Sequence, residues 1–284
     1  MKKYKICKIL LVILAIFLCV AFYELLGICV AYKKQPEVSN TTKKETKNGS
    51  WNECSENTER AVIIEKNPEA LLQRVRLIKN AKKEIILSTF AFQSDESGKL
   101  ILGALHDAAD RGVHIRLLVD GMESWIDMEG NPYFYGLSSH ENVEIKLYNK
   151  ANPLKPWKIM GRMHDKYLIA DGKRYILGGR NTYNYFLGDF PGHKNYDRDV
   201  LVVCDEPEKE NSVNQLLEYF ETIWEQEDSG YFHDNKKLAN RKSVKNAVLE
   251  LQNGYQKYFE ENKERICDTD YTDETFEPEK ISLV

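Results

Sequence analysis

Residues 164–181 read HDKYLIADGKRYILGGRN, and this stretch decides how the rest of the chain is interpreted. Written as a pattern it is H-x-K-x4-D-x6-G-G-x-N, and the fixed positions are His164, Lys166, Asp171, Gly178, Gly179 and Asn181. Side chains at positions i and i+2 of a β-strand point to the same face, so His164 and Lys166 are expected to stand together while Asp165 turns away. Asp171-Gly172 is typical of a tight turn, after which RYIL returns as the second strand of a hairpin.

The residue types in this pattern suit the chemistry of a phosphodiester. A neutral imidazole nitrogen is a competent nucleophile for phosphorus, and a neighbouring ammonium neutralises charge on the phosphoryl oxygens. Gly178-Gly179 leaves room where a phosphate approaches the backbone, and Asn181 offers it an amide donor. Each residue alone has a duller explanation, such as a surface histidine or a bend, but together they indicate a catalytic site. The arrangement requires no metal ion and no other cofactor.

The pattern resembles the signature of the phospholipase D superfamily, and the wider sequence resembles the N-terminal half of its bacterial cardiolipin synthase branch. The resemblance implies that His164, Lys166 and Asp171 are catalytic. Four further positions are expected to bind or support the phosphate, namely Gly178, Gly179, Arg180 and Asn181. For Arg180 two interpretations stay open, because its guanidinium could clamp a phosphate with two hydrogen bonds or pair with an aspartate.

Asp197 and Asp199 lie at the head of the last strand pattern, DRDVLVVC. A nucleophilic histidine needs a hydrogen-bond acceptor on its other ring nitrogen, which fixes the tautomer and favours the charged intermediate. In related enzymes an acidic residue at the head of this strand has that role. Both aspartates are therefore candidates for orienting His164, and Asp197 is the better match. A solvated acidic strand end is the alternative for Asp199.

Strand patterns alternate with helical patterns on both sides of the motif, as in α/β proteins. Apolar residues at helical spacing follow Asn67-Pro68, which looks like an N-cap with proline at the first helical position, and recur over residues 98–112. Strands are expected at 84–92, 113–120 and 143–148. We therefore predict an α/β domain over residues 60–228, in which a mixed β-sheet is flanked by helices as in the phospholipase D half-unit.

The first 35 residues are of a different kind. Residues 9–32 are apolar apart from Glu24 and reach the length of a membrane-spanning helix. Four lysines precede this run and two follow it closely, which favours a cytoplasmic N-terminus and an extracytoplasmic body. A cleaved signal peptide is the alternative, although no small-x-small cleavage site follows the run cleanly. We predict a single-pass anchor in the cell membrane over 1–35 and a polar tether over 36–59 that is too poor in apolar residues to fold.

After residue 228 the sequence predicts a helical connector and an acidic tail over 229–284. Relatives with two motifs carry such a connector before a second half with its own H-x-K-x4-D. Here no histidine other than His164 is followed two residues later by lysine. The chain is thus interpreted either as a half that pairs with a second copy or as a truncated half.

Composition narrows the choice of partners. The formal net charge is −4, and residues 1–35 carry six lysines but one glutamate, so the rest of the chain is more acidic still. An acidic body argues against general binding to nucleic acid and favours phospholipids. Outside the anchor, three scattered cysteines form no disulfide framework: Cys54, Cys204 and Cys267.

Three functions stay open. In the first, a homodimer brings two copies of His164 together; one attacks phosphorus to form a phosphohistidine and the other protonates the leaving alcohol. Phosphatidylglycerol is the expected substrate, and the product would be cardiolipin with phosphatidylglycerol as acceptor or phosphatidic acid with water. The second is a truncated, catalytically inactive relative that binds lipid at the membrane. The third is a membrane-tethered, dimeric single-motif nuclease or phosphodiesterase.

Overall fold

The computed structural model describes residues 2–33, 59–206, 211–233 and 236–278, together with Ile281 and Leu283. The tether predicted over 36–59 lies outside these residues except for Glu59. The chain divides into two compact units, which are described separately. The smaller contains α1 (Lys2–Lys33) and residues 151–162, which we had expected in the catalytic domain; the larger contains the sheet and the other α-helices.

Within the described residues, an eight-stranded sheet forms the centre of the larger unit, in the order β1-β7-β6-β5-β2-β3-β4-β8. Its strands are β1 (Arg60–Ile64), β2 (Glu84–Thr89), β3 (His114–Asp120), β4 (Val143–Tyr148), β5 (Lys166–Ala170), β6 (Arg174–Gly178), β7 (Asp199–Val203) and β8 (Ser229–Tyr231). β2, β3 and β4 run parallel, and the other neighbours pair antiparallel. The mixed sheet predicted from the sequence is therefore confirmed.

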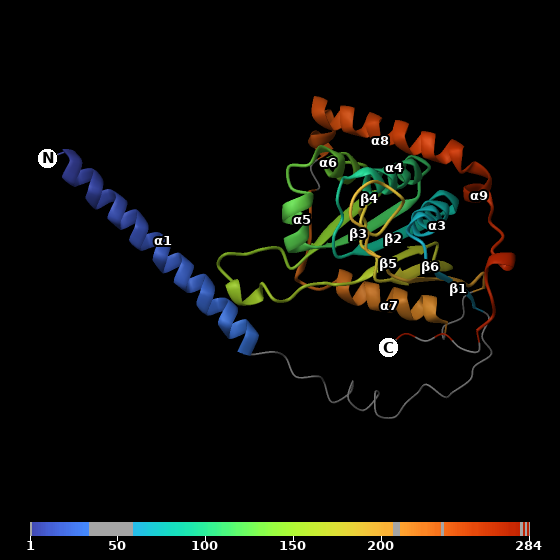
Figure 1. Cartoon of the computed structure of the whole chain (residues 1–284), viewed down its shortest axis with the longest axis horizontal. Coiled ribbons are helices and arrows are strands. Elements are labelled where there is room, and N and C mark those ends of the chain that lie inside the picture. Colours follow the sequence, from blue (N-terminus) through green and yellow to red (C-terminus); the bar gives the residue numbers. More distant parts are fainter. Residues whose placement is uncertain are drawn as a thin grey trace. The chain divides into compact units, whose positions relative to one another are not determined.

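Helices cover both faces of this sheet (Figure 1). The α-helices of the larger unit are α3 (Asn67–Asn80), α4 (Glu96–Asp110), α5 (Gly121–Asp127), α6 (Pro132–Ser138), α7 (Ser212–Trp224), α8 (Lys242–Glu261) and α9 (Lys263–Cys267), and its short 3-10 turns are η3 (Lys236–Asn240) and η4 (Thr272–Glu274). The 3-10 turn η2 (Pro156–Lys158) belongs to the smaller unit. One face packs against α3, α4, α6 and α8, and Leu87 of β2 belongs to that core. The other face packs against α7, and Ile86 of β2 and Phe220 of α7 belong to the core on that side. Successive residues of β2 are thus buried on opposite faces, which explains its continuous apolar sequence.

The helical C-terminal extension predicted after residue 228 is present and packs as part of the core. α8 lies against α4 so closely that a Cβ added at Gly103 would be 2.7 Å from an α8 carbonyl oxygen. The acidic tail is held by Arg76, which donates to the Glu274 carboxylate at 2.9 Å. Phe276 then exchanges two backbone hydrogen bonds with Ala61, at 2.8 and 2.9 Å. This contact covers the edge strand β1, where unpaired backbone groups would otherwise face solvent.

α1 is the apolar N-terminal helix that the sequence predicts. Among the described residues it alone, over Lys5–Lys33, is long and apolar enough to cross a membrane, a test that a signal sequence also passes. Residues 151–162 pack against it within the smaller unit. The Tyr23 hydroxyl donates to the Leu154 carbonyl oxygen at 2.9 Å, and a Cβ added at Gly27 would lie 2.3 Å from the Pro156 ring.

Candidate active site

The hairpin predicted from the motif is confirmed, and one of its ends brings two predicted residues together. β5 pairs antiparallel with β6, and Asp171 and Gly172 in the turn have φ angles of 55° and 63°. β5 begins at Lys166, so His164 precedes the strand by two residues. The Lys166 Nζ donates to the carbonyl oxygen of His164 at 2.6 Å. The lysine therefore supports the backbone that carries the histidine.

Phe90 is a site residue that the sequence did not single out. It follows Thr89, which pairs with Lys166 across β2 and β5. The ring centroids of Phe90 and His164 lie 4.7 Å apart in an edge-on arrangement, and the Lys166 Nζ is 5.4 Å from the Phe90 centroid. Phe90 thus contacts both members of the motif. The segment STFAF could have drawn attention to it, but only the pairing of β2 with β5 shows which of its residues reaches the motif.

His164 and Lys166 differ in their exposure to solvent. The Lys166 side chain is buried, whereas His164 is exposed. Burial lowers the pKa of Lys166 from its ordinary value of 10.5, and the carboxylates of Asp165 and Asp197 oppose that shift. A partly desolvated ammonium interacts strongly with an anion that reaches it, because little water screens the charge. The arrangement suits an exposed nucleophile beside a cationic site for phosphoryl oxygens.

Two carboxylates fix the chain around the histidine of the motif. Asp120, at the end of β3, accepts from the Met163 backbone N–H at 3.0 Å with one oxygen and caps the first turn of α5 with the other. Asp165 accepts from the Tyr219 hydroxyl of α7 at 2.9 Å, and burial raises its pKa. Because α7 covers the face opposite α3 and α4, Asp165 points away from Lys166, as the alternation of strand side chains predicts.

Asn181 lies beside the segment that follows β2, and so close to the same end of β5. Its Oδ1 accepts from the Ala91 backbone N–H at 3.3 Å, while the neighbouring Thr182 N–H donates to the Ala91 carbonyl oxygen at 3.0 Å. The Asn181 side chain also forms a hydrogen bond with the side chain of Tyr183. The structure therefore brings Asn181 to the region of His164 and Lys166.

The two glycines of the motif leave room for carboxylates. A Cβ added at Gly179 would lie 2.0 Å from Oδ2 of Asp197, and one added at Gly178 would lie 2.1 Å from Oδ1 of Asp199. These two aspartates, both candidates for orienting His164, have different surroundings. Asp197 is exposed and acts electrostatically on Lys166, whereas Asp199 is buried.

Asp199 and Arg180 form a buried ion pair within the larger unit. The Asp199 carboxylate pairs with Arg74 of α3 at 2.9 Å and with Arg180 at 3.2 Å, and the Asp199 and Arg180 side chains are fully buried. Arg180 also donates to the chain that joins β1 to α3. An aspartate committed to two guanidinium groups under α3 is not available to orient His164. Arg180 thus makes the pairing with an aspartate that is one of its two expected interpretations, and phosphate binding by Arg180 stays a prediction.

Asp171 lies at the opposite end of β5 from the histidine and lysine. It is five residues beyond Lys166, roughly 16 Å along an extended strand. Its carboxylate accepts from the backbone N–H groups of Lys82, Lys83 and Glu84 at 2.7 to 3.1 Å. The structure therefore separates Asp171 from His164 and Lys166, and its hydrogen bonds to residues 82–84 favour a structural role over the predicted catalytic one.

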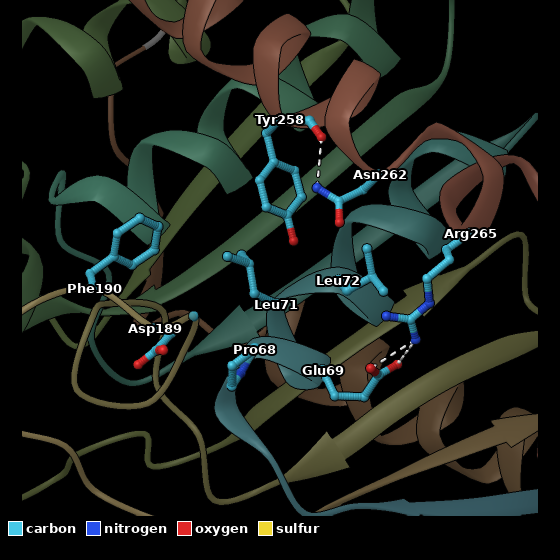
Figure 2. A pocket seen from close by; sticks show the side chains of 10 residues that line it. Pro68, Glu69, Leu71, Leu72, Asp189, Phe190, Tyr258, Asn262 and Arg265 are labelled. Atoms are coloured by element: carbon cyan, nitrogen blue, oxygen red, sulfur yellow. Dashed lines mark hydrogen bonds and ion pairs between the residues drawn. The ribbon is translucent and has the colours of Figure 1, made fainter.

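A cavity of about 220 Å³ lies elsewhere in the larger unit, between α3, the loop at 188–190 and the α8–α9 region (Figure 2). Its wall includes the apolar side chains of Leu71 and Phe190, and an ion pair between Glu69 and Arg265 at 2.8 Å lies at one side. None of the residues that line it belongs to the motif. Within the described ranges, no group of three or more His, Cys, Asp or Glu residues could hold a metal ion.

Comparison with known families agrees with this fold and motif. The family model described as "Cardiolipin synthase, PLD-like domain" matches residues 74–224, more than half of the chain. The chain belongs to the phospholipase D superfamily. Within it, the protein is a cardiolipin synthase-like member.

Individual relatives cover parts of the chain. An uncharacterised protein of Helicobacter pylori strain J99 is 30% identical over 212 residues, which cover 69% of this chain and 39% of that protein. Cardiolipin synthase C of Escherichia coli K12 is 29% identical over 171 residues, covering 55% of this chain and 34% of that enzyme. The chain thus spans well under half of the length of either relative. The solved structure of phosphatidylserine synthase from Haemophilus influenzae Rd KW20 shares the fold, with a TM-score of 0.52 at 18% identity over 78% of this chain and 48% of that one.

Proposed function

We propose that the protein is a membrane-anchored phosphatidyltransferase or phosphodiesterase that acts on phospholipids through a phosphohistidine, in the manner of a cardiolipin synthase. The observation that carries this proposal is the exposed imidazole of His164 beside the buried ammonium of Lys166 at one end of β5. The similarity to cardiolipin synthases and the acidic composition of the body support a phospholipid, with phosphatidylglycerol as the first choice, over a nucleic acid.

Each group at this end of the sheet has a role in the proposed reaction. The His164 imidazole attacks phosphorus, the bond from phosphorus to the leaving alcohol oxygen breaks, and a phosphohistidine forms. Lys166 and the Asn181 amide bind the non-bridging oxygens, where negative charge increases. Asp197 accepts a hydrogen bond from the other ring nitrogen and stabilises the cationic intermediate. An acceptor alcohol or water then attacks phosphorus and releases the imidazole.

The leaving alcohol needs a proton, and the chain contains a single H-x-K pair. We propose that a second copy of the chain supplies the donor, so that one His164 is the nucleophile and the other is the general acid. The exposure of His164 supports this arrangement, because the imidazole is open to solvent although the Phe90 ring lies beside it.

The membrane position belongs to the same proposal. α1 has the length and composition of an anchor. The boundaries at 35, 59 and 228, the cytoplasmic N-terminus and the extracytoplasmic body remain predictions from the sequence. A catalytically inactive relative that binds lipid is the alternative, and the absence of turnover by a folded, dimeric protein would favour it.

Turnover of phosphatidylglycerol in mixed micelles by the full-length chain tests the activity. Wild type should release cardiolipin or phosphatidic acid, and His164→Ala should lower the rate roughly 10⁴-fold or more while the far-UV spectrum stays unchanged. A substrate radiolabelled at phosphorus should leave label on the wild-type protein in a form that acid releases and base does not. Equal rates for wild type and His164→Ala would contradict the assignment.

Subunit mixing tests the second half-site. If both histidines of a dimer are needed, an equal mixture of exchanged wild-type and His164→Ala chains should retain about a quarter of the wild-type rate, whereas independent subunits should retain about half. Cross-linking before and after exchange confirms that mixed dimers form. Retention of half of the rate after complete exchange would contradict the shared site.

A further inference from the structure

Residues 151–162, which lead from β4 toward His164, have an unusual composition. They contain Lys155, Lys158 and Arg162 but no acidic residue. Three of their large apolar side chains are exposed: Leu154 at 78%, Trp157 at 46% and Met160 at 57%. Basic residues interspersed with apolar and aromatic ones are typical of segments that bind the surface of an anionic bilayer.

This segment packs on one face of the apolar helix α1. Four positions of α1 are less exposed than the residues around them, namely Glu24, Gly27, Ile28 and Ala31. Their spacing of three and four places them on one side of the helix. The hydrogen bond from Tyr23 to Leu154 and the close approach of Gly27 to Pro156 lie on the same stretch of α1. The smaller unit therefore consists of an apolar helix with a basic, aromatic segment against its C-terminal turns.

The length of α1 sets the depth of that contact in a bilayer. The apolar helix runs over Lys5–Lys33, 29 residues, which is about 44 Å at 1.5 Å per residue. The hydrocarbon core of a bilayer is about 30 Å thick, which is about 20 helical residues. With the charged Lys5 at one boundary of that core, α1 reaches the other boundary near Leu25, and its last turns extend into the headgroup region. Residues 151–162 lie against those turns. Tryptophan and lysine prefer this depth, because each has an apolar part and a polar or charged end.

We propose that residues 151–162 form an interfacial membrane-binding element, and that its partner is the surface of an anionic phospholipid bilayer. The proposal rests on the membrane anchoring and phospholipid substrate set out above. Leu154, Trp157 and Met160 enter the boundary between headgroups and acyl chains, and the three basic residues contact lipid phosphates. Arg162 precedes His164 by two residues, a span of at most about 7 Å. The element is therefore joined directly to the segment that carries the proposed nucleophile.

Fluorescence quenching tests the insertion without relying on turnover. The full-length protein is reconstituted into vesicles of phosphatidylcholine and phosphatidylglycerol whose acyl chains carry bromine, which quenches tryptophan on contact. The brominated lipid should quench the fluorescence of Trp157. In the Trp157→Phe variant, the fraction of the emission that the brominated lipid quenches should therefore be smaller than in wild type. Trp224 is buried at 4% exposure and serves as the unquenched internal reference. If Trp157→Phe leaves the quenched fraction unchanged, the proposal is overturned.

Comparison of two substrates tests the consequence for catalysis. The variant Leu154→Ser/Trp157→Ser/Met160→Ser should turn over long-chain phosphatidylglycerol in vesicles at least about tenfold more slowly, because it loses three inserted side chains. It should turn over monomeric dihexanoyl phosphatidylglycerol within about twofold of wild type, because that substrate needs no bilayer contact. Leu249→Ser, on the exposed face of α8 with 57% exposure, is the matched control.

The outcomes separate this inference from the function on which it rests. Unchanged turnover in vesicles overturns the inference. The inference is also overturned if the triple serine variant loses turnover equally on both substrates and sediments as a monomer where wild type is a dimer. In that case the segment would contact a second copy of the chain and not the bilayer. If wild type turns over neither substrate, the proposed function fails, while the quenching of Trp157 still decides whether the segment enters the bilayer.

Discussion

Asp171→Ala should destabilise the protein without removing its chemistry. The carboxylate accepts from the backbone N–H groups of Lys82, Lys83 and Glu84, and the residue itself has a φ of 55°. A hydrogen bond to a charged group contributes about 1.5–3 kcal/mol when buried, and we take about 1 kcal/mol for each here because Asp171 is only half-buried. The free energy of unfolding should therefore fall by about 3 kcal/mol. For a body of this size that corresponds to a Tm lower by roughly 6–12 °C.

Urea unfolding and phosphatidylglycerol turnover, measured on the same samples, check this expectation. Turnover per folded molecule, well below the unfolding transition, should stay within about threefold of wild type because the carboxylate is remote from the nucleophile. Asp171→Asn keeps an acceptor oxygen and tolerates a positive φ, so it should lose only about 1 kcal/mol. If Asp171→Ala unfolds like wild type but loses turnover about a hundredfold or more, the structural reasoning is refuted and the residue acts in the chemistry.

Gly179→Ala should lower turnover with little change in stability, because its methyl group displaces the exposed carboxylate of Asp197. Gly178→Ala should instead lower the free energy of unfolding by about 3 kcal/mol or more, because it collides with the buried Asp199. Denaturation and turnover measure the contrast, and equal effects of the two changes would contradict it. The pKa of Lys166 lies below its ordinary value of 10.5. If the charged lysine is needed, the turnover rate should therefore start to decline, as the pH is raised, before pH 10.5 is reached. Asp197→Asn removes a carboxylate that raises this pKa and should move this decline to lower pH still, which a pH–rate profile of the variant shows.

The parts of the fold that can be predicted from the sequence are those determined by residues close together in the chain. The turn at Asp171-Gly172 follows from the backbone preferences of two residues, and the hairpin follows from the turn. The alternation of strand and helix patterns predicts the mixed sheet because each element must bury an apolar face. The same local reasoning identifies His164 and Lys166, whose separation of two residues brings them together in any extended segment.

The parts that the sequence does not predict depend on residues far apart in the chain. The buried pair of Arg74 and Asp199 joins positions 125 residues apart, and no local pattern distinguishes Asp199 from Asp197. Asn67 was predicted to be an N-cap, but the cap is Lys66, and Asn67 is the first residue of α3. Its side chain accepts from Arg180 and donates to two carbonyl oxygens of the loop after β6. Because the Asn67 side chain forms these tertiary hydrogen bonds, it does not cap the N-terminus of α3.

The spacing of the motif has a geometric cause as well as a chemical one. Asp171 binds the backbone of residues 82–84, where β2 begins, and the other end of β2 carries Thr89 and Phe90 beside Lys166. Asp171 therefore fixes the register of β2 against β5 at one end, and that register determines which residues meet the ammonium at the other. Because strand side chains alternate, a shift of one residue would turn the lysine to the opposite face. The four residues between the lysine and the aspartate are thus the length of strand that separates Lys166 from the carboxylate that fixes its register. This distance explains how an acidic residue remote from the predicted phosphate site belongs to the signature.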